Sequence, residues 1–389
     1  MAVPVPFAEL VEVGRANGLD QVGACSAEPF LPTREVLLER RQAGLAGSMQ
    51  FTYRNPERST DPEATLPGAR SIVVAACSYH RDPPPRPADA GPVARVGRYV
   101  WSDDRERLLR GLHAVADHLQ ASGHRACVVS DQNHLVDRAA AHRAGLGWFG
   151  KNANILVPGH GSFFVLGEVL TDAGPEDLPG VTEPEPVADG CGACERCIPA
   201  CPTGAIVAPG VIDARRCLSW TLQATGSFPV EQREALGDRI YGCDDCQDVC
   251  PPNRLEIRRA APGGSGAPVP QGDPDRTWVP LLIMLAASDE ELMERHGDWY
   301  IARRDPVHLR RNALVVLGNV GDGSDPAVRE ALATALQHES PLVRAHAVWS
   351  ARRLGCDDLL TAVVDDPDVD VQAELTRSVP RRLPQPRAL

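Results

Sequence analysis

The chain has 389 residues, enough for two or three domains that each bury a core. Hydrophobic residues make up 43% and charged residues 24%, ordinary globular values that exclude a mostly disordered chain. No run of about 18 apolar residues occurs, and the N-terminus lacks the pattern of a secretory signal. The net charge of -12 argues against nucleic-acid binding through an overall positive field, but a local basic patch stays open. We therefore expect a cytoplasmic protein without a membrane segment.

The first 171 residues mix strand and helix patterns. Ser71 to Cys77 is a β-branched apolar run after a Pro-Gly turn, which predicts a buried strand. Ala126 to Val129 and Phe163 to Leu170 predict two more strands. Between them, residues 105 to 121 carry leucines at helical spacing behind Ser102 and Asp103, which are candidate N-caps. This mixture predicts an α/β domain over residues 1–175.

Two breaks follow this domain. Residues 172–190 are rich in proline, glycine and acids and predict a connector, and residues 260–275 have the composition of a flexible linker or long loop. The cysteine-rich block between the breaks predicts a ferredoxin-type domain over 176–258. Everything after the second break is expected to be helical, and we place a third domain over 278–389.

The last part contains an internal repeat. The segment that starts at Pro306 aligns with the segment that starts at Pro341, so that Arg310 matches Arg344 and Gly321 matches Gly355. Paired helices at this spacing predict a short HEAT-like solenoid. Its arginines form either a solvated helix face or a face that binds a polyanion, and the sequence leaves both open.

Cysteine usage is the strongest functional signal. Twelve cysteines in a reducing compartment are unlikely to be disulfides, and eight of them lie between Cys191 and Cys250. The motif CGACERCIPACP has the bacterial ferredoxin spacing, in which three thiolates bind one cubane cluster and the fourth binds the other. A second motif, GCDDCQDVCP, lacks one cysteine of the full run, and Cys217 is the natural replacement.

Eight thiolates suffice for two 4Fe-4S clusters. Crossing the motifs assigns four ligands to each cluster: Cys191, Cys194, Cys197 and Cys250 to one, and Cys201, Cys217, Cys243 and Cys246 to the other. Structural zinc is the alternative, but it favours two isolated C-x2-C pairs and would leave thiols unused. The four isolated cysteines are expected to be buried in apolar packing: Cys25, Cys77, Cys127 and Cys356.

At this point the sequence resembles the epoxyqueuosine reductase family. The matching stretches run in family order: RNPE at Arg54, LVDRAAAHRAGLGWFGKN from Leu135, SFFVLGE at Ser162, the first cysteine motif, DARRCLSW around Cys217, and YGCDDCQDVCP. RRNALVVLGN at Arg310 is also similar to the end of that family. The resemblance implies an α/β cobalamin-binding domain, a double 4Fe-4S domain and C-terminal HEAT-like repeats.

The resemblance also implies a reaction, the reduction of epoxyqueuosine at the wobble position of a tRNA to queuosine with loss of water. Cobalamin, reloaded by the two clusters, would do the difficult chemistry, and a carboxyl with a raised pKa would protonate the leaving oxygen. The family's proposed acid follows a strand and precedes an arginine by seven residues, as Asp131 does with Arg138. Family members often have small residues and a proline after this aspartate, whereas Gln132 follows it here. Asp137 fits better as a helix N-cap, which leaves Asp131 for the chemistry.

Family position further suggests cofactor contacts from Arg54, Lys151, Asn152, Ser219 and Gln247 besides Asp131, although each could equally be a surface or internal polar group. A basic face of the solenoid, with Arg310, Arg311 and Arg344, would hold the tRNA anticodon stem-loop. We expect a monomer. Three alternatives stay open: a reductive dehalogenase-like enzyme, a non-catalytic electron-transfer scaffold, and a family member with another substrate.

Overall fold

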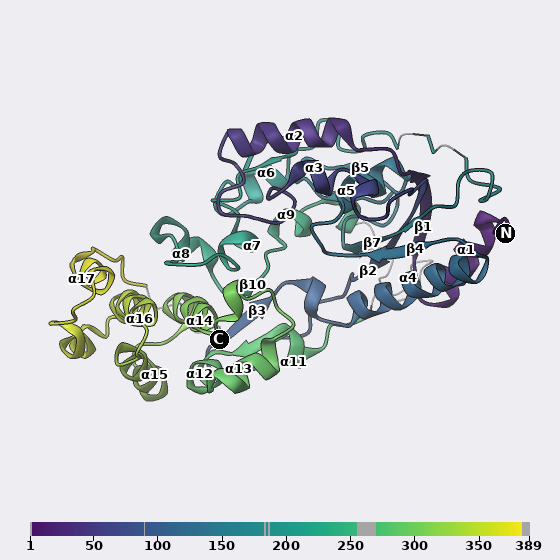
Figure 1. Ribbon diagram of the computed structural model, residues 1–389. Helices are drawn as coiled ribbons and strands as arrows, with labels where there is room; N and C mark the ends of the chain where they lie inside the picture. The colour runs from purple at the N-terminus through teal and green to yellow at the C-terminus, as the bar shows by residue number, and fades with distance from the viewer. Residues whose placement is uncertain (1, 89, 183, 186, 255–269, 383–389) are drawn as a thin grey trace. The chain divides into compact units, whose positions relative to one another are not determined.

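The computed structural model describes residues 2–88, 90–182, 184–185, 187–254 and 270–382. They form two compact units, each built from three segments of the chain (Figure 1). Unit 1 comprises residues 1–82, 98–215 and 244–272, and unit 2 comprises 83–97, 216–243 and 273–389. The cysteine-rich block is therefore divided between the units. Most of the break expected at 260–275 lies outside the described residues.

Unit 1 is built on a four-stranded sheet in the order β1 (Gln21–Ser26), β2 (Ser71–Ser78), β7 (Phe164–Thr171) and β4 (Ala126–Val129). All neighbouring strands are antiparallel. The three strands predicted from the sequence are β2, β4 and β7. The register pairs Val129, the last residue of β4, with Glu168 of β7.

Helices cover both faces of this sheet. Figure 1 shows α4 (Asp104–Ala121) along one face, where it packs with α1 (Phe7–Ala16). The core of the opposite face includes residues of α2 (Leu31–Gln42) and α5 (Asp137–Arg143). Side chains of a strand alternate between faces, and β2 accordingly contributes Val73 and Ala75 to one core and Ile72 and Val74 to the other.

The remaining elements of unit 1 are short. The short helices α3 (Pro56–Ser59) and η1 (Pro62–Ala64) precede β2, and η2 (Arg98–Val100) follows it. The hairpin of β5 (Trp148–Phe149) and β6 (Ile155–Leu156) follows α5. The cysteine motifs carry α6 (Cys197–Ala200) and α9 (Asp245–Asp248), which pack together. A second hairpin joins β8 (Ile206–Ala208) and β9 (Val211–Ile212).

Unit 2 contains a small sheet that the sequence did not predict. β3 (Val93–Val96) lies between β10 (Arg239–Tyr241), which is parallel to it, and β11 (Trp278–Pro280), which is antiparallel. The expectation that everything after the second break is helical is therefore wrong at β11. Trp278 and Val279 find strand partners only in a segment almost two hundred residues earlier, and no local pattern reveals that pairing.

The rest of unit 2 is helical. Between Cys217 and β10 lie α7 (Leu218–Thr221) and α8 (Val230–Leu236), and α11 (Pro274–Thr277) precedes β11. After β11 come α12 (Leu281–Ala286), α13 (Asp289–His296) and η3 (Ala302–Arg304). Neither these helices nor any other helix of the described part is long and apolar enough to cross a membrane.

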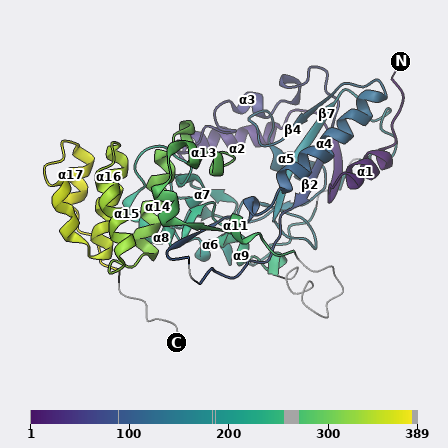
Figure 2. The same ribbon diagram turned by 90° about the horizontal axis from the view of Figure 1, so that it is seen from below.

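The predicted repeat is present in unit 2. It comprises α14 (Val307–Val320), α15 (Pro326–Leu336), α16 (Pro341–Leu354), η4 (Asp357–Val363) and α17 (Val369–Thr376), with the helices side by side in Figures 1 and 2. The equivalent helices α14 and α16 pack against each other. Gly318 permits this, because a Cβ there would lie 2.5 Å from the Trp349 ring.

Candidate functional site

The first cysteine motif lies entirely in unit 1, and Cys250 lies near it. Burial, followed by the thiolates of Cys191, Cys197 and Cys194, raises the pKa of Cys250 to about 12. The pKa of Cys197 is also raised, by burial and by Cys191 and Cys194. These four sulfurs are thus close enough to repel one another as thiolates, and bound positive metal would relieve that repulsion. The arrangement fits the first ligand set expected from the sequence.

These thiols do not surround one point. Among the described residues, no three histidine, cysteine or acidic side chains could together hold a single metal ion. A cubane cluster separates its four ligands by the size of the cluster itself, so it asks for thiols spaced around a larger volume. The spread of the cysteines is compatible with a cluster of that kind.

The other four cysteines are divided between the units. Cys201 and Cys246 belong to unit 1, whereas Cys217 and Cys243 belong to unit 2. The sulfur of Cys201 accepts a hydrogen bond from the backbone N–H of Ala205 at 3.2 Å. Backbone hydrogen bonds to sulfur are one of the means by which proteins set the reduction potential of iron-sulfur clusters. Cys217 stands at the N-cap position of α7, and Cys243 follows β10 by two residues.

Lys151 and Asn152 lie at the turn of the β5–β6 hairpin and contact the cysteine segments of unit 1. The Lys151 ammonium lies 3.5 Å from the Glu195 carboxylate, between two cysteines of the first motif. Asn152 is buried, and its Nδ2 donates to the carbonyl of Cys246 at 3.4 Å. Gly147 serves the hairpin itself, because a Cβ there would lie 2.2 Å from the Leu156 carbonyl oxygen.

Gln247 is part of a buried polar network. Its Oε1 accepts hydrogen bonds from the Ser162 hydroxyl at 2.9 Å and from the Tyr79 hydroxyl at 3.4 Å. Asn253 donates to both the Ser162 hydroxyl and the Gln247 carbonyl. Burial raises the pKa of Tyr79, which keeps its phenol neutral. These contacts anchor the residues after Cys246 to the strand end at Tyr79.

Asp131 follows β4 by two residues and has a φ of 53°, in the left-handed region that non-glycine residues rarely adopt. Its side chain is exposed, yet the protein atoms around it raise its pKa by desolvation, against an opposing effect of Arg105. The same loop holds the buried Oδ1 of Asn133, which has no hydrogen-bond partner in the described structure. Backbone strain of this kind is common at functional sites.

Asp137 does not have the role expected for it. Val136, not Asp137, occupies the N-cap position of α5, and Asp137 is the first helical residue. Its carboxyl instead lies against that of Glu168, a fully buried residue in the middle of β7. Burial raises the pKa of both groups; the negative charge of Asp137 raises that of Glu168 further, whereas at Asp137 the added repulsion comes from Asp131 and the hydrogen bond with Glu168 acts in the opposite direction. Glu168 is not among the residues predicted from the sequence, although a single acid inside the apolar run FFVLGEVL is a visible signal.

The last two predicted cofactor contacts belong to other segments of the chain. Arg54 is exposed just before α3 in unit 1, where its backbone N–H donates to Gln50. Ser219 is half-buried in α7 of unit 2.

The three arginines expected to bind RNA are not on an open face. Arg311 is 1% exposed, and Arg310 is 7% exposed and paired with Asp289. Arg344 forms a bidentate ion pair with Asp366 at 2.6 and 3.0 Å. The expectation was wrong because these side chains point from α14 and α16 toward neighbouring segments, where buried arginine satisfies carbonyl and carboxylate groups.

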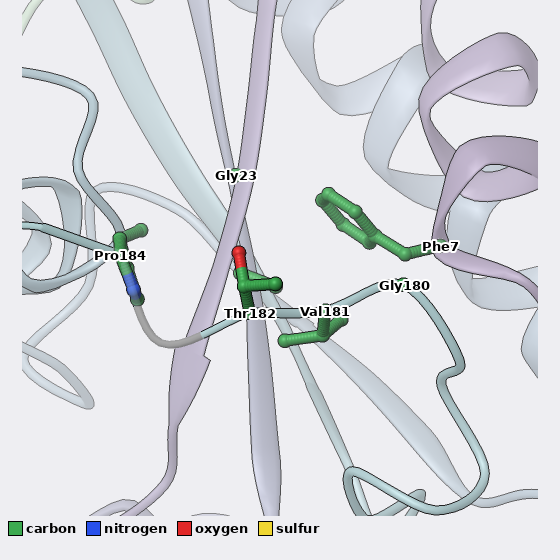
Figure 3. A pocket seen from close by; sticks show the side chains of 8 residues that line it. Phe7, Gly23, Gly180, Val181, Thr182 and Pro184 are labelled. Atoms are coloured by element: carbon green, nitrogen blue, oxygen red, sulfur yellow. The ribbon is translucent and has the colours of Figure 1, made fainter.

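A hollow of about 170 Å³ in unit 1 is a separate feature. Figure 3 shows Phe7, Val181 and Pro184 around it, with the Thr182 hydroxyl as its polar side chain. None of the predicted site residues lines it. Its small size and the few polar side chains among its lining residues do not suit a large polar cofactor.

Two known families match segments of the chain. Residues 190–253 match the family of 4Fe-4S double cluster binding domains. Residues 299–381 match the HEAT repeats. The first match favours iron-sulfur clusters over the zinc alternative, and the second confirms the predicted repeat.

Whole-chain comparisons extend the similarity. An epoxyqueuosine reductase from Bacillus subtilis is 32% identical over 95% of this chain and 94% of its own length. One from Pseudomonas aeruginosa is 35% identical over 88% of this chain and 92% of its own. A solved epoxyqueuosine reductase bound to an epoxyqueuosine-modified tRNA-Tyr stem loop superimposes with a TM-score of 0.81 at 30% identity, covering 95% of this chain and 96% of that one. The chain belongs to the epoxyqueuosine reductase family.

Proposed function

We propose that the protein reduces epoxyqueuosine in tRNA to queuosine. The observation that carries this proposal is the similarity, over nearly the whole length of both chains, to relatives named epoxyqueuosine reductase, one of them solved with an epoxyqueuosine-modified tRNA stem loop. The reaction takes two electrons and two protons, breaks both carbon–oxygen bonds of the epoxide, and leaves an alkene and water. The dehalogenase-like and scaffold alternatives are not favoured by these relatives.

Two 4Fe-4S clusters would deliver the electrons one at a time. We assign Cys191, Cys194, Cys197 and Cys250 to one cluster, which the mutual influence of these thiols in unit 1 supports. The remaining four, Cys201, Cys217, Cys243 and Cys246, are assigned to the other on their spacing.

Cobalamin is the proposed cofactor at the substrate. Two observations fit a polar ligand beside the loop after β4: the unpartnered buried Oδ1 of Asn133 and the exposed, strained Asp131. When bound, the corrinoid supplies a cobalt centre that can pass electrons to an epoxide carbon. The residues proposed to hold or border its polar groups are Arg54, Asp131, Lys151, Asn152, Ser219 and Gln247. The internal contacts of Lys151, Asn152 and Gln247 fix them against the cysteine segments, which suits a border position.

Asp131 is the proposed proton donor. A donor to the leaving oxygen must carry its proton near neutral pH, and the raised pKa of Asp131 is in the required direction. Burial of the carboxyl by cofactor and substrate would raise the pKa further, because desolvation disfavours the charged form. A relative from Bacillus subtilis was solved with its catalytic aspartate loop swung out of the active site. The strained backbone at Asp131 would suit a loop with two positions.

The tRNA partner needs a different surface from the one predicted. Arg303 and Arg304 are exposed in η3 of unit 2, and both have left-handed φ values, 56° and 57°. Tyr300, 57% exposed, lies two residues before η3. Arginine and an exposed aromatic side chain suit phosphate and base contacts. We propose that this segment contacts the RNA in the cytoplasm.

An anaerobic assay tests the function directly. Protein with reconstituted clusters is mixed with a strong reductant and tRNA that carries epoxyqueuosine, with or without cobalamin, and the digested nucleosides are measured by mass spectrometry. Queuosine that forms only with cobalamin supports both substrate and cofactor. An intact epoxide with fully loaded protein overturns the substrate assignment.

A further inference from the structure

Arg311 is a buried arginine of the helical repeat that donates to four backbone carbonyls. Its Nη1 donates to the carbonyls of Ala224 and Gly226, each at 2.7 Å. Its Nη2 donates to the carbonyls of Leu222 at 3.2 Å and Thr221 at 3.3 Å. The guanidinium therefore holds the whole segment 221–226 from α14. Every residue of this contact belongs to unit 2.

The segment held by Arg311 leads directly to a proposed cluster ligand. The backbone N–H of Thr221 donates to the Cys217 carbonyl at 2.9 Å, and the Thr221 hydroxyl donates to the same carbonyl at 3.1 Å. Because α7 is only four residues long, it gains little stability from its own hydrogen bonds. The contact with Arg311 therefore fixes the end of the turn whose start carries Cys217.

Asn312 joins that segment to a second one. Its Nδ2 donates to the Leu222 carbonyl at 2.9 Å and to the Ile240 carbonyl in β10 at 3.5 Å. Ile240 precedes Cys243 by three residues. The Asn312 Oδ1 accepts from Arg311 Nε at 3.0 Å and Nη2 at 2.8 Å, which orients the guanidinium. One side-chain pair thus bridges the two backbone segments that carry Cys217 and Cys243.

The charge of Arg311 is costly at this position. Burial, together with repulsion from Arg233, lowers its pKa to about 9. The buried acid Glu374 pairs with Arg233 instead, at 2.9 Å. Burying a cation among carbonyl groups without a carboxylate is expensive. An iron-sulfur cluster with four thiolates carries net negative charge, and a fixed cation nearby stabilises it.

We propose that Arg311 and Asn312 are positioning residues for the cluster bound by Cys217 and Cys243. The pair fixes the separation of the two ligand segments, and the guanidinium places a positive charge that favours the reduced cluster. This inference rests on the ligand assignment in the proposed function. It gives the first helix of the repeat a role in electron delivery that does not involve RNA.

Cluster content and potential test the inference without any substrate. Arg311→Met and Asn312→Ala are purified anaerobically and reconstituted, and iron per chain and the midpoint potentials are measured by redox titration followed by electron paramagnetic resonance. Arg311→Met should lose part, up to about half, of the roughly eight irons of two 4Fe-4S clusters. In the chains that keep the second cluster, its midpoint potential should be lower than in the wild type. Arg311→Lys keeps the positive charge, but its ammonium cannot bond all four carbonyls. Compared with Arg311→Met, it should recover the midpoint potential more fully than the iron content.

The matched control is Arg344→Met. Arg344 matches Arg310 in the repeat, the position just before Arg311, and it likewise donates to backbone carbonyls, those of His338 and Glu339. Arg344→Met should lower the free energy of unfolding but should not reduce the iron content. Folded Arg311→Met and Asn312→Ala proteins with wild-type iron and potentials would overturn the proposal. Cys217→Ser separates the assumptions: if it keeps about eight irons, the ligand assignment is wrong, whereas failed epoxide reduction leaves these readouts unaffected.

Discussion

Asp137 and Glu168 bury two carboxyl groups against each other in unit 1. Glu168 pairs in register with Val129, two residues before Asp131, and the negative charge of Asp131 acts on Asp137. No other group of the described residues hydrogen-bonds the Glu168 oxygens. The positive charge of Arg138 partly offsets the negative charge at Asp137. On the β1 side the titratable group that interacts with Glu168 is the Cys25 thiol, which burial keeps neutral. Two acids in this setting are stable only if at least one stays protonated.

Because of this pair, we expect the free energy of unfolding to fall as the pH rises. The pKa of Asp137 is raised from its ordinary value of 3.8 to about 7 in the folded protein. Between these two pH values the folded state therefore binds more protons than the unfolded chain. The contribution to stability is therefore full at acidic pH and is lost as the pH rises through this window. We expect Glu168→Gln to reduce the difference in free energy of unfolding between pH 5 and pH 8 by on the order of 2 kcal/mol in urea titrations.

Glu176→Gln is the control, because Glu176 is exposed and paired with Arg70 on the surface of the same unit. Its removal should leave the pH dependence nearly unchanged. A Glu168→Gln protein with the wild-type slope between pH 5 and pH 8 would show that the buried pair does not hold an extra proton.

Local patterns predicted the elements that depend on local interactions. β4 spans Ala126–Val129 as expected, and the leucine spacing located α4 to within a residue. The pairing of Glu168 with Asp137 depends on the register of β4 with β7 and on the direction of α5, neither of which a local pattern contains. Periodicity alone also cannot tell which arginines of a repeat point inward. Arg311 has the sequence pattern of a surface residue, yet it is buried against carbonyl groups. Its burial is not predictable from local sequence because those acceptors lie some ninety residues earlier in the chain.

Asp131→Asn should lose turnover while both cofactors are retained. The amide keeps the shape of the side chain but cannot donate an acidic proton, and loss of a general acid lowers rates by about 10²- to 10⁴-fold. The measurement is single-turnover formation of queuosine with iron and cobalt contents determined on the same sample. Asp117→Asn, an exposed carboxyl of α4, is the control. Turnover within a few-fold of wild type would remove Asp131 as the proton donor.

Serine substitutions test the ligand sets. Cys250→Ser should remove the first cluster and Cys217→Ser the second, each leaving about four irons per chain after reconstitution. Cys127→Ser is the control, since Cys127 lies in β4, outside both motifs, and the variant should keep about eight irons. If Cys250→Ser instead disturbed the same cluster signals as Cys201→Ser, the crossed assignment would have to be replaced.

Arg303→Glu should weaken RNA binding without loss of iron. Arg303 is exposed and held in a left-handed conformation, which costs free energy and is retained in proteins mainly where function needs it. Replacing one phosphate contact by a negative charge should lower the affinity for an anticodon stem-loop roughly tenfold and reduce the slope of its salt dependence by about one. Fluorescence anisotropy at several salt concentrations measures both. Arg15→Glu, an exposed arginine of α1 in unit 1, makes the same change in net charge and should bind almost as wild type. Equal affinities of the two variants would mean that only overall charge matters, and the segment at η3 would then have no specific part in holding the RNA.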